Sequence, residues 1–489
     1  MKLTTHLAFL IFTSVWISSP ILVHGQITVF EKTYNYDFSE VANDVEQTAD
    51  GGFILVGEQG VTIGQTRIFM TKTDSLGIEE WHQFYGGPYS NRGRSVCQSP
   101  DGGYLFVGNT SGEEVIGTQN KLFVVRTDVL GDTLWTHIFG NGTFPDNGLD
   151  VKLMDDSTYQ ILGIIQSHNP DGKADIYLFN MNDMGEVLWE SIIGDSEVHD
   201  TASKFEVLDD GSFILVGNRQ VSGAQNDALI VKTDSIGNLI WAKSYGWENS
   251  ENAQDIKVTS TGELMVLAGT ASFNSYLAND LYLLKLDSEG DTIWTKVHLG
   301  EGESEETALA MVRQGDDFIL AGYNHNEQEI YGKIQLQKID ANGDILWKKR
   351  LGGENDNVWS IIKTFDNGLA LSGSKSSGCF SCAYLIKTND EGSLVSLAPP
   401  ILANEVIGFD LYPNPSSGLV NISSTFESPF GIRWKLVDVT GRKWPVNIAK
   451  VLGKINTFQV DLSNFPKGIY FIQSVSPNSK TSSKMILLQ

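Results

Sequence analysis

Cysteine is scarce in this sequence, with three residues in 489. So few cysteines cannot form the disulfide framework that is typical of small exported proteins. Cys379 and Cys382, in "GCFSCA", have the spacing of a redox or half-zinc site, but no second CxxC or HxxxH pair completes four ligands. We expect either a local bridge between them or two semi-buried thiols in a loop, and no metal or other cofactor.

Basic residues are also few, since 35 Lys and Arg stand against 60 Asp and Glu, for a formal charge of -25. Nucleic acids and anionic membranes attract proteins with a field of Lys and Arg, so neither is expected as a partner. The charge is unevenly distributed, because from Gly408 onward there are nine Lys and Arg and four Asp and Glu. An acidic body and a mildly basic tail are expected to form separate units.

Long apolar runs are missing beyond the first two dozen residues, where none reaches the roughly 18 residues that cross a bilayer. The mature protein is therefore not expected to be transmembrane. The start, "MKLTTHLAFLIFTSVWISSPILVHGQ", is apolar from Leu7 to about Val23 and predicts a signal peptide at 1–25, cleaved near Gly25. A single-pass anchor is the alternative, although "SSP" at 18–20 interrupts the run. No Cys lies near the cleavage point, which argues against a lipoprotein.

A helical period of 3.6 residues is absent between residues 27 and 396, and a repeat of about fifty residues is present instead. Its first mark is a tryptophan four residues after a glycine. The tryptophans are separated by 54, 54, 52, 53 and 53 residues: Trp81, Trp135, Trp189, Trp241, Trp294 and Trp347. Such a period is too long for one solenoid coil and typical of a four-stranded propeller blade.

A second mark is the turn written "DGGF" in its cleanest form, which precedes an apolar strand such as "FILVG" and occurs seven times. Each unit then predicts four strands: one before the DGG turn, the "FILVG" run, a segment such as "RIFMTKTD", and the strand with the tryptophan. Short apolar runs between Gly and Asp turns are typical of strands buried on both faces, as in blades stacked around a ring.

The two ends of the repeat are complementary. The seventh copy reaches Gly392, and Ser396 stands at the position of the tryptophan. At the other end, "VFEKTYNYDFSEVANDV" aligns without a gap to "IWAKSYGWENSENAQDI" and places Phe30 at the tryptophan register. We therefore predict an all-β fold in which residues 26–396 form a seven-bladed β-propeller closed by the N-terminal strand, which leaves no free sheet edge. An open β-solenoid is the alternative.

Stretches such as "KLDSEGDTIWTKVHLG" resemble the docking repeat of quinoprotein-type propellers, shortened by one residue. The DGG and tryptophan pattern is also similar to repeat proteins that are common among secreted proteins of Bacteroidetes-type bacteria. This resemblance implies a fold and not a function. Quinoprotein dehydrogenases use adjacent cysteines and a calcium-binding acid cluster, and Cys379 and Cys382 are not adjacent.

Catalytic motifs are missing: no GxSxG, Walker, HExxH or complete EF-hand pattern occurs. Asp44, Asp150 and Asp255 share one register, six residues before the DGG mark, which would bring them near a central channel. Other polar residues interrupt a full acid ring there: Ser95, Lys204 and Ser360. We interpret the three aspartates as polar inner-strand residues, with a cation or substrate site as the alternative.

Aromatic residues in the expected loops, Trp247, Tyr276 and Tyr323, are candidates for stacking on sugars or peptides. Two longer insertions, "SGEEVIGTQN" at 111–120 and "SFNSYLAND" at 272–280, lie between the second and third strands of their units. Variable loops on a rigid scaffold commonly carry binding sites. These are the loops in which we expect a ligand to bind.

After the repeat, residues 397–407 form a linker with prolines at 399 and 400, and residues 408–489 contain short alternating strands. They predict a small Ig-like β-sandwich. Four ordered motifs within them resemble the type A C-terminal sorting domain of the type IX (Por) secretion system. The matching residues are Tyr412, Pro413, Asn414, Pro415, Gly418, Leu436, Asp438, Gly441, Asp461, Leu462, Pro466, Gly468, Ile469, Tyr470, Lys484, Leu487 and Leu488.

That resemblance implies an outer-membrane translocon as partner and a protein that is released or anchored at the outer cell surface. An ordinary adhesive sandwich would not contain this ordered set. The sequence thus predicts a secreted, non-catalytic propeller that binds a glycan, a peptide or a surface protein. An extracellular polysaccharide-acting enzyme is the alternative, but a glycosidase needs two carboxylates at a defined separation, and among 60 acids many pairs occur by chance.

Overall fold

The computed structural model describes residues 28–36, 38–62, 64–111, 119–141, 143–155, 157–195, 197–223, 225–273, 279–299, 305–325, 332–376, 381–394, 409–424, 433–438, 442–446, 449–450, 457–475 and 481–488. The chain divides into two compact units, Met1–Ser396 and Leu397–Gln489. The expected signal peptide (1–25), linker (397–407), Tyr276, Cys379 and Gly441 lie outside the described residues. In the part of the chain that is described, no helix has the length and apolar character that a membrane crossing requires.

The described strands of the first unit form seven four-stranded antiparallel sheets that resemble propeller blades. Sheet 1 contains β2 (Glu40–Gln47), β3 (Phe53–Thr62), β4 (Gln65–Thr73) and β5 (Glu79–Tyr85). Sheet 2 contains β6 (Asn91–Gln98), β7 (Tyr104–Thr110), β8 (Lys121–Thr127) and β9 (Thr133–Phe139). Sheet 3 contains β10 (Asn147–Leu153), β11 (Tyr159–Ile165), β12 (Asp175–Met181) and β13 (Val187–Ile193).

The remaining four sheets repeat this order. Sheet 4 contains β14 (Asp200–Val207), β15 (Phe213–Ser222), β16 (Gln225–Thr233) and β17 (Leu239–Tyr245), and sheet 5 contains β18 (Glu251–Val258), β19 (Leu264–Thr270), β20 (Asp280–Leu286) and β21 (Thr292–His298). Sheet 6 contains β22 (Glu305–Gln314), β23 (Asp317–His325), β24 (Lys333–Ile339) and β25 (Ile345–Leu351). Sheet 7 contains β26 (Asn357–Lys363), β27 (Leu369–Lys375), β28 (Cys382–Thr388) and β1 (Phe30–Tyr34). The four strands of each sheet are called A to D in this order.

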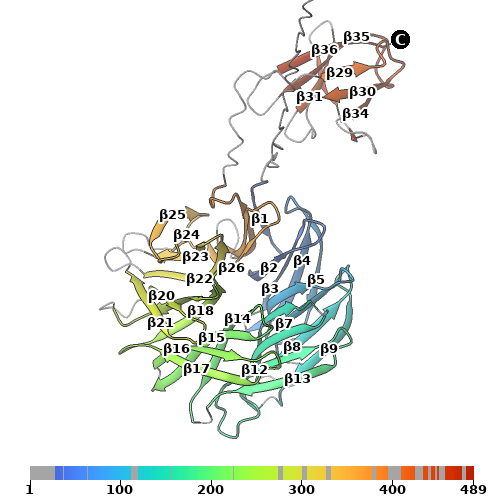
Figure 1. The fold of residues 1–489 in the computed structure, drawn as a ribbon. Helices are drawn as coiled ribbons and strands as arrows, with labels where there is room; N and C mark the ends of the chain where they lie inside the picture. The colour runs from blue at the N-terminus through green and yellow to red at the C-terminus, as the bar shows by residue number, and fades with distance from the viewer. Residues whose placement is uncertain are drawn as a thin grey trace, which may run out of the picture. The chain divides into compact units, whose positions relative to one another are not determined.

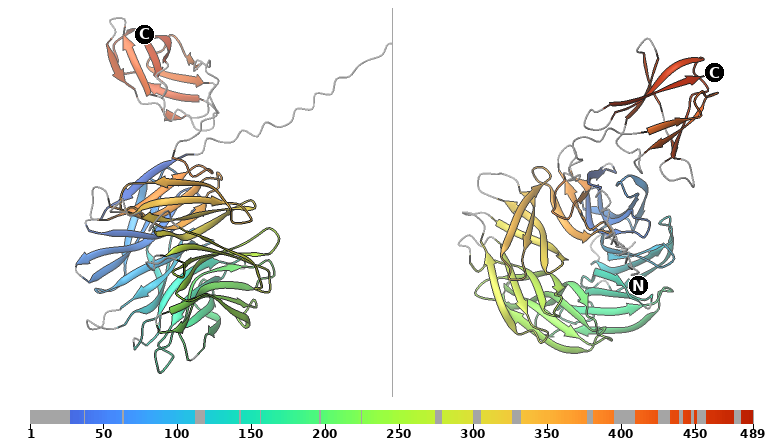
Figure 2. Two further views of the ribbon diagram at one scale, coloured as in Figure 1. Left: turned by 90° about the vertical axis from the view of Figure 1, so that its left-hand side faces the viewer. Right: turned by 45° about the horizontal axis from the view of Figure 1, so that its top comes forward.

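The N-terminal strand supplies strand D of sheet 7, as the complementary ends of the repeat predict. β1 pairs antiparallel with β28, with Phe30 opposite Lys387 and Tyr34 opposite Ala383. Each strand A contacts strand A of the next sheet, and β26 of the last sheet contacts β2 of the first. The succession of sheets therefore returns to its start, as Figure 1 and Figure 2 show.

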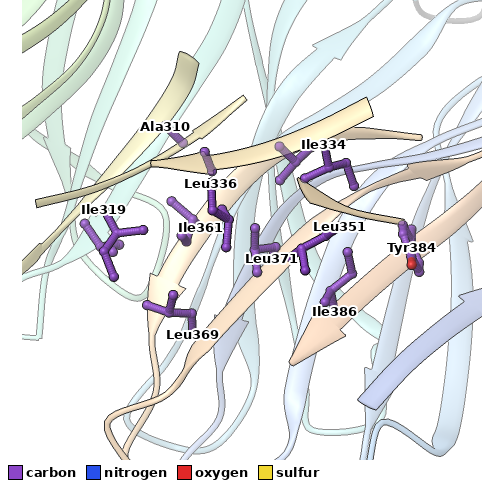
Figure 3. Close-up of a cluster of buried hydrophobic side chains, with 13 residues drawn as sticks. Ala310, Ile319, Ile334, Leu336, Leu351, Ile361, Leu369, Leu371, Tyr384 and Ile386 are labelled. Carbon is purple, nitrogen blue, oxygen red and sulfur yellow. The ribbon is translucent and has the colours of Figure 1, made fainter. Parts of the chain in front are cut away.

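The apolar core lies between neighbouring sheets, because strands B and C are buried on both faces. Between sheets 6 and 7, Ile319 and Leu336 of one sheet pack with Ile361 and Leu371 of the other (Figure 3). Similar clusters lie between the other pairs of sheets, including sheets 7 and 1. This burial explains why strands B and C are continuous apolar runs in the sequence.

The tryptophan of each repeat lies against the glycine of the turn between strands C and D in the next sheet. These glycines have φ between +68° and +83°, and a Cβ atom there would lie 2.5 to 3.3 Å from the aromatic ring of the preceding sheet. The pairs are Trp81–Gly131, Trp135–Gly185, Trp189–Gly237, Trp241–Gly290, Trp294–Gly343, Trp347–Gly392 and, across the closure, Phe30–Gly77. The repeated glycine and aromatic residue therefore dock one sheet on the next.

The second unit contains two four-stranded sheets around one apolar core. One sheet has the order β29 (Phe409–Tyr412), β30 (Leu419–Ser424), β34 (Thr457–Asp461) and β33 (Ala449–Lys450). The other has the order β32 (Lys443–Pro445), β31 (Arg433–Asp438), β35 (Gly468–Val475) and β36 (Thr481–Leu488). Ile422 and Phe458 from the first sheet pack in the core with Leu436 and Ile472 from the second.

Candidate functional site

The seven strands A each carry a β-bulge at the same point, and the residue after each bulge lines one common cavity. The bulges lie before Asp44, Ser95, Asp150, Lys204, Asp255, Ala310 and Ser360. All seven residues line the central cavity, whose volume is about 200 Å³. The structure thus brings Asp44, Asp150 and Asp255 to one channel, together with the residues that interrupt the acid ring.

The three channel aspartates accept backbone hydrogen bonds from the neighbouring sheet. Val96 N–H donates to Asp44 over 3.2 Å, Phe205 N–H donates to Asp150 over 3.4 Å, and Met311 N–H donates to Asp255 over 2.7 Å. Because each bond crosses from one sheet to the next, these carboxylates join adjacent sheets.

Side chains occupy the remaining oxygens of these aspartates. The hydroxyls of Ser95 and Ser360 donate to Asp44 over 2.9 and 2.8 Å. Lys204 donates to Asp150 over 2.9 Å. Burial alone would lower the pKa of Lys204, but the carboxylates of Asp150 and Asp44 raise it above its usual value. The ammonium therefore stays charged and bound to its partner.

A second layer of ionisable residues lies two positions further along the same strands. Glu206 binds Lys152 over 2.7 Å and Lys257 over 2.5 Å. Burial opposes ionisation of Glu206, yet the two lysines lower its pKa to about 2. In contrast, burial raises the pKa of Glu46 to about 8, against the opposing effect of the Gln98 N–H bond. Glu46 is therefore a neutral acid at pH 7. In contrast, the three channel aspartates accept hydrogen bonds from the neighbouring sheets, and Glu206 forms ion pairs with two lysines.

Metal-binding geometry is not found in the described part of the chain, where no group of three or more His, Cys, Asp or Glu side chains is arranged to hold an ion. Cys97 is a buried free thiol, and burial raises its pKa. Cys382 is disulfide-bonded, which agrees with the local-bridge alternative for that cysteine.

Of the expected loop aromatics that the structure describes, Trp247 is more exposed than Tyr323. Its ring is 43% exposed and lies 4.6 Å from that of Phe273, which is also exposed. Phe273 is the second residue of the insertion at 272–280, most of which lies outside the described residues, as does most of the insertion at 111–120. Tyr323 lies in β23. An exposed aromatic pair thus stands at the described edge of one candidate binding loop.

A larger cavity, of about 610 Å³, lies between sheets 3 and 4 and was not predicted from the sequence. It is lined by the polar side chains of Thr158, Gln160 and Asn180, by the carboxylate residues Asp155 and Asp209, and by apolar residues that include Trp189 and Phe213. Its size is in the range of small-ligand sites in proteins. The signal that would have found it is Asn180, which stands where the other repeats have Lys or Arg.

In the second unit, motifs that are far apart in the sequence meet. Asn414 donates to the carbonyl of Met485 over 2.9 Å, and Leu487 N–H donates to Asn414 over 3.0 Å. A Cβ atom at Gly418 would lie 2.8 Å from the Cα of Ser463. The first motif, residues 412–418, therefore contacts both the third motif, residues 461–473, and the terminal strand β36.

Asp438 and Tyr470 are opposite each other in β31 and β35. Tyr470 is buried in the core of this unit and donates its hydroxyl hydrogen to the Pro466 carbonyl over 2.8 Å. Residues 410–488 match the family model described as the secretion system C-terminal sorting domain. The second unit is a sorting domain of this family. This sorting domain indicates handling by the type IX secretion system and a secreted or surface location.

The regulatory protein FlaEY of Caulobacter vibrioides is similar to part of this chain, with 26% identity over 203 residues. The match covers 35% of this chain and 21% of FlaEY, so this chain spans about a fifth of the length of that curated relative.

Three solved structures illustrate the structural neighbours of this chain. A protein of unknown function from Dyadobacter fermentans has a TM-score of 0.42 and 10% identity, and the match covers 73% of this chain and 97% of that one. The WD40 domain of Neurospora crassa Pan2 has a TM-score of 0.44 and 12% identity, with coverage of 71% and 89%. YCF48 bound to D1 peptide has a TM-score of 0.44 and 12% identity, with coverage of 76% and 99%.

Proposed function

We propose that this protein is a secreted, non-catalytic binding protein of a Bacteroidetes-type bacterium. In this proposal a signal peptide (1–25) directs export, a seven-bladed β-propeller (26–396) binds the ligand, and a linker (397–407) joins it to an Ig-like sorting domain (408–489). The protein acts at or outside the outer cell surface, after recognition by the type IX translocon. Its ligand is a glycan, a peptide or a surface protein.

The observation that carries the non-catalytic part of the proposal is the bonding of the channel aspartates. A glycosidase needs one carboxylic acid that donates a proton and one free carboxylate at a defined distance. Asp44, Asp150 and Asp255 instead accept N–H bonds that hold neighbouring sheets together, so the protonated Glu46 in the same cavity has no free carboxylate among these three aspartates. Residues with this role support a rigid ring that presents its loops to a ligand.

The test is a glycan and peptide array probed with the full chain, with mass spectrometry of every bound compound. We expect retention without a shortened product. Replacing the exposed Trp247 by Ala should weaken binding if the loops carry the site, whereas Trp359→Ala, which alters an exposed aromatic residue in the channel, should leave it unchanged. A shortened glycan, produced by the wild type and lost in Asp150→Asn, would overturn the proposal.

A further inference from the structure

Six of the seven sheets have a buried or partly buried cation of their own near the turn between strands A and B, and Lys72, Arg126 and Lys387 are the buried ones. The residue is the lysine or arginine near the end of strand C: Lys72, Arg126, Lys232, Lys285, Lys338 and Lys387. In five of them it pairs with an acid at the start of strand B or in the turn before it, at 2.7 to 3.1 Å: Lys72–Asp50, Arg126–Asp101, Lys285–Glu263, Lys338–Asp317 and Lys387–Asp366. A cation at this position is thus a standard part of the repeat.

The best-defined example is Lys72 in sheet 1. Its ammonium donates to Asp50 over 2.8 Å and to the carbonyl of Thr73 over 2.8 Å. Burial would raise the pKa of Asp50, but Lys72 and the nearby Thr48 and Gly52 donors lower it to about 2. The second glycine of the DGG turn leaves space for this ammonium, because a Cβ atom at Gly52 would lie 2.7 Å from it.

Sheet 3 is the exception, because Asn180 replaces the cation. Its amide donates to Thr158 over 2.9 Å and to Gln160 over 3.4 Å. Asn180 is 6% exposed, and it lines the cavity of about 610 Å³. The cavity therefore opens where the repeat lacks its long cationic side chain.

The lining of this cavity is complementary to a cation. It contains two exposed carboxylates, Asp155 and Asp209, and among the described residues that line it there is no Lys, Arg or His. Trp189 supplies an aromatic ring, and cations are attracted to the face of such a ring. In sheets 4 to 6 a lysine two residues after the tryptophan lies 4.6 to 5.6 Å from that ring, whereas Ser191 stands at this position in sheet 3.

In each of the two sheets around the cavity, the turn between strands C and D has an exposed apolar residue. Met184 in sheet 3 is 79% exposed, and Ile236 in sheet 4 is 56% exposed and follows Ser235, which lines the cavity. The equivalent residues are also apolar and exposed in sheets 1 and 2, Leu76 and Leu130, and polar in sheets 5 to 7, Glu289, Asn342 and Glu391. Exposed apolar residues beside a pocket are typical of surfaces that bind another protein.

We propose that the cavity between sheets 3 and 4 binds the lysine or arginine side chain of an extracellular peptide or protein. The partner's cation takes the place that Lys72 and its equivalents fill in the other sheets, and its neighbouring apolar residues contact Met184 and Ile236. The proposal rests on the proposed function, in which the first unit binds a ligand without converting it. The net charge of -25 favours the approach of such a basic partner.

The experiment measures the affinity of the full chain for fluorescent peptides of the form Gly-Leu-X-Leu-Gly with a blocked amino terminus, where X is Lys, Arg, norleucine or Glu. Anisotropy should show that the Lys and Arg peptides bind at least about tenfold more tightly than the other two, because only they supply the cation. Added salt should weaken their binding. Equal affinity for the norleucine peptide would overturn the proposal.

The decisive variant is Asn180→Lys, which gives sheet 3 the cation of its neighbours. It should reduce the affinity for the Lys peptide at least about tenfold. If its melting temperature falls, the double variant Asp155→Asn and Asp209→Asn provides the same test without an added buried charge. Asp132→Asn in sheet 2 changes the charge by the same single unit as Asn180→Lys and should leave the affinity unchanged. Unchanged affinity in both cavity variants would contradict the proposal.

The outcomes also separate this proposal from the proposed function. If the array retains glycans and the peptides do not bind, the cavity assignment fails and the binding function stands. If mass spectrometry finds the peptide cleaved, the non-catalytic function fails.

Discussion

The ring of Phe30 lies against Gly77, where a Cβ atom would come within 2.5 Å of the ring. Phe30 belongs to β1, which completes sheet 7, and Gly77 belongs to sheet 1. The same contact joins Trp81 to Gly131 between sheets 1 and 2. The junction between the last and the first sheet is therefore built like the other junctions.

Replacing Gly131 by Ala should destabilise the first unit. The alanine would have to adopt a φ of +81°, and its Cβ atom would lie 2.8 Å from the ring of Trp81. We expect a loss of about 2–3 kcal/mol in urea denaturation. The matched control is Gly262→Ala, with a φ of +83° and no atom within 4 Å. If both variants lost the same stability, packing on the tryptophan would contribute nothing.

Replacing Phe30 by Ala should weaken the closure of the ring of sheets. The change removes the contacts of this side chain with Gly77 and with Phe53, whose ring centroid lies 6.0 Å away. We expect the free energy of unfolding to fall by about 2 kcal/mol. We also expect more association between molecules, because an unpaired β28 is an exposed sheet edge. Thermal melting and light scattering measure both effects. Phe38→Ala alters an exposed ring and should change neither.

Glu46 should make the protein less stable as the pH rises. Burial raises its folded pKa from 4.5 to about 8, so the folded state keeps a proton that the unfolded state releases. Stability should therefore fall between about pH 4.5 and pH 8 and level off above. Glu46→Gln should remove this loss, so that the variant melts higher than the wild type at pH 8 but not at pH 4.5. Parallel melting curves at both pH values would contradict the assignment.

Asp44→Asn should lower stability without affecting ligand binding. The carboxylate accepts hydrogen bonds from Ser95, Val96 and Ser360, and hydrogen bonds to a charged group contribute about 1.5–3 kcal/mol each. We expect a loss of about 2 kcal/mol in urea denaturation. Asp171→Asn changes an exposed aspartate and should have no effect. A variant of full stability that no longer binds the ligand would show that Asp44 contacts the ligand.

Asn414→Ala should reduce secretion. It removes the two hydrogen bonds between Asn414 and β36, to Met485 and from Leu487, at a cost of about 1–2 kcal/mol. The fraction of the chain found outside the cells, measured by immunoblot, should fall. Asn464→Ala changes an exposed asparagine of the same unit and should be secreted normally. Equal secretion of both variants would show that this contact is not needed.

The repeat predicted much of the fold because its marks are residues that each sheet needs for docking. The tryptophan and glycine spacing gives the sheet order, and the alignment of Phe30 predicts that β1 pairs with the last repeat. The shared register of Asp44, Asp150 and Asp255 predicts their common channel. Their bonds to neighbouring sheets were not predictable, because a strand pattern tells which face a side chain occupies and not which N–H group it meets.

The cavity beside Asn180 was missed for a related reason. The sequence shows that Asn180 stands where the six other repeats have a lysine or an arginine. It does not show that these cations form ion pairs, as Lys72 does with Asp50, so it gives no reason to expect a cavity where the cation is missing. The loop sites were the least predictable part, because the contact between Trp247 and Phe273 depends on how two loops that are separate in the sequence approach each other in the folded protein.

The pairing of β1 with β28 also sets an order of events for the growing chain. Residues 30–34 are synthesised long before the strand with which they pair, which ends at Thr388. Until that strand is made, β1 has no place in a sheet, and closing so long a loop carries an entropic cost. Detachment of these five residues would likewise free both the first and the last sheet. The lifetime of the folded first unit should therefore depend on how slowly this short strand detaches.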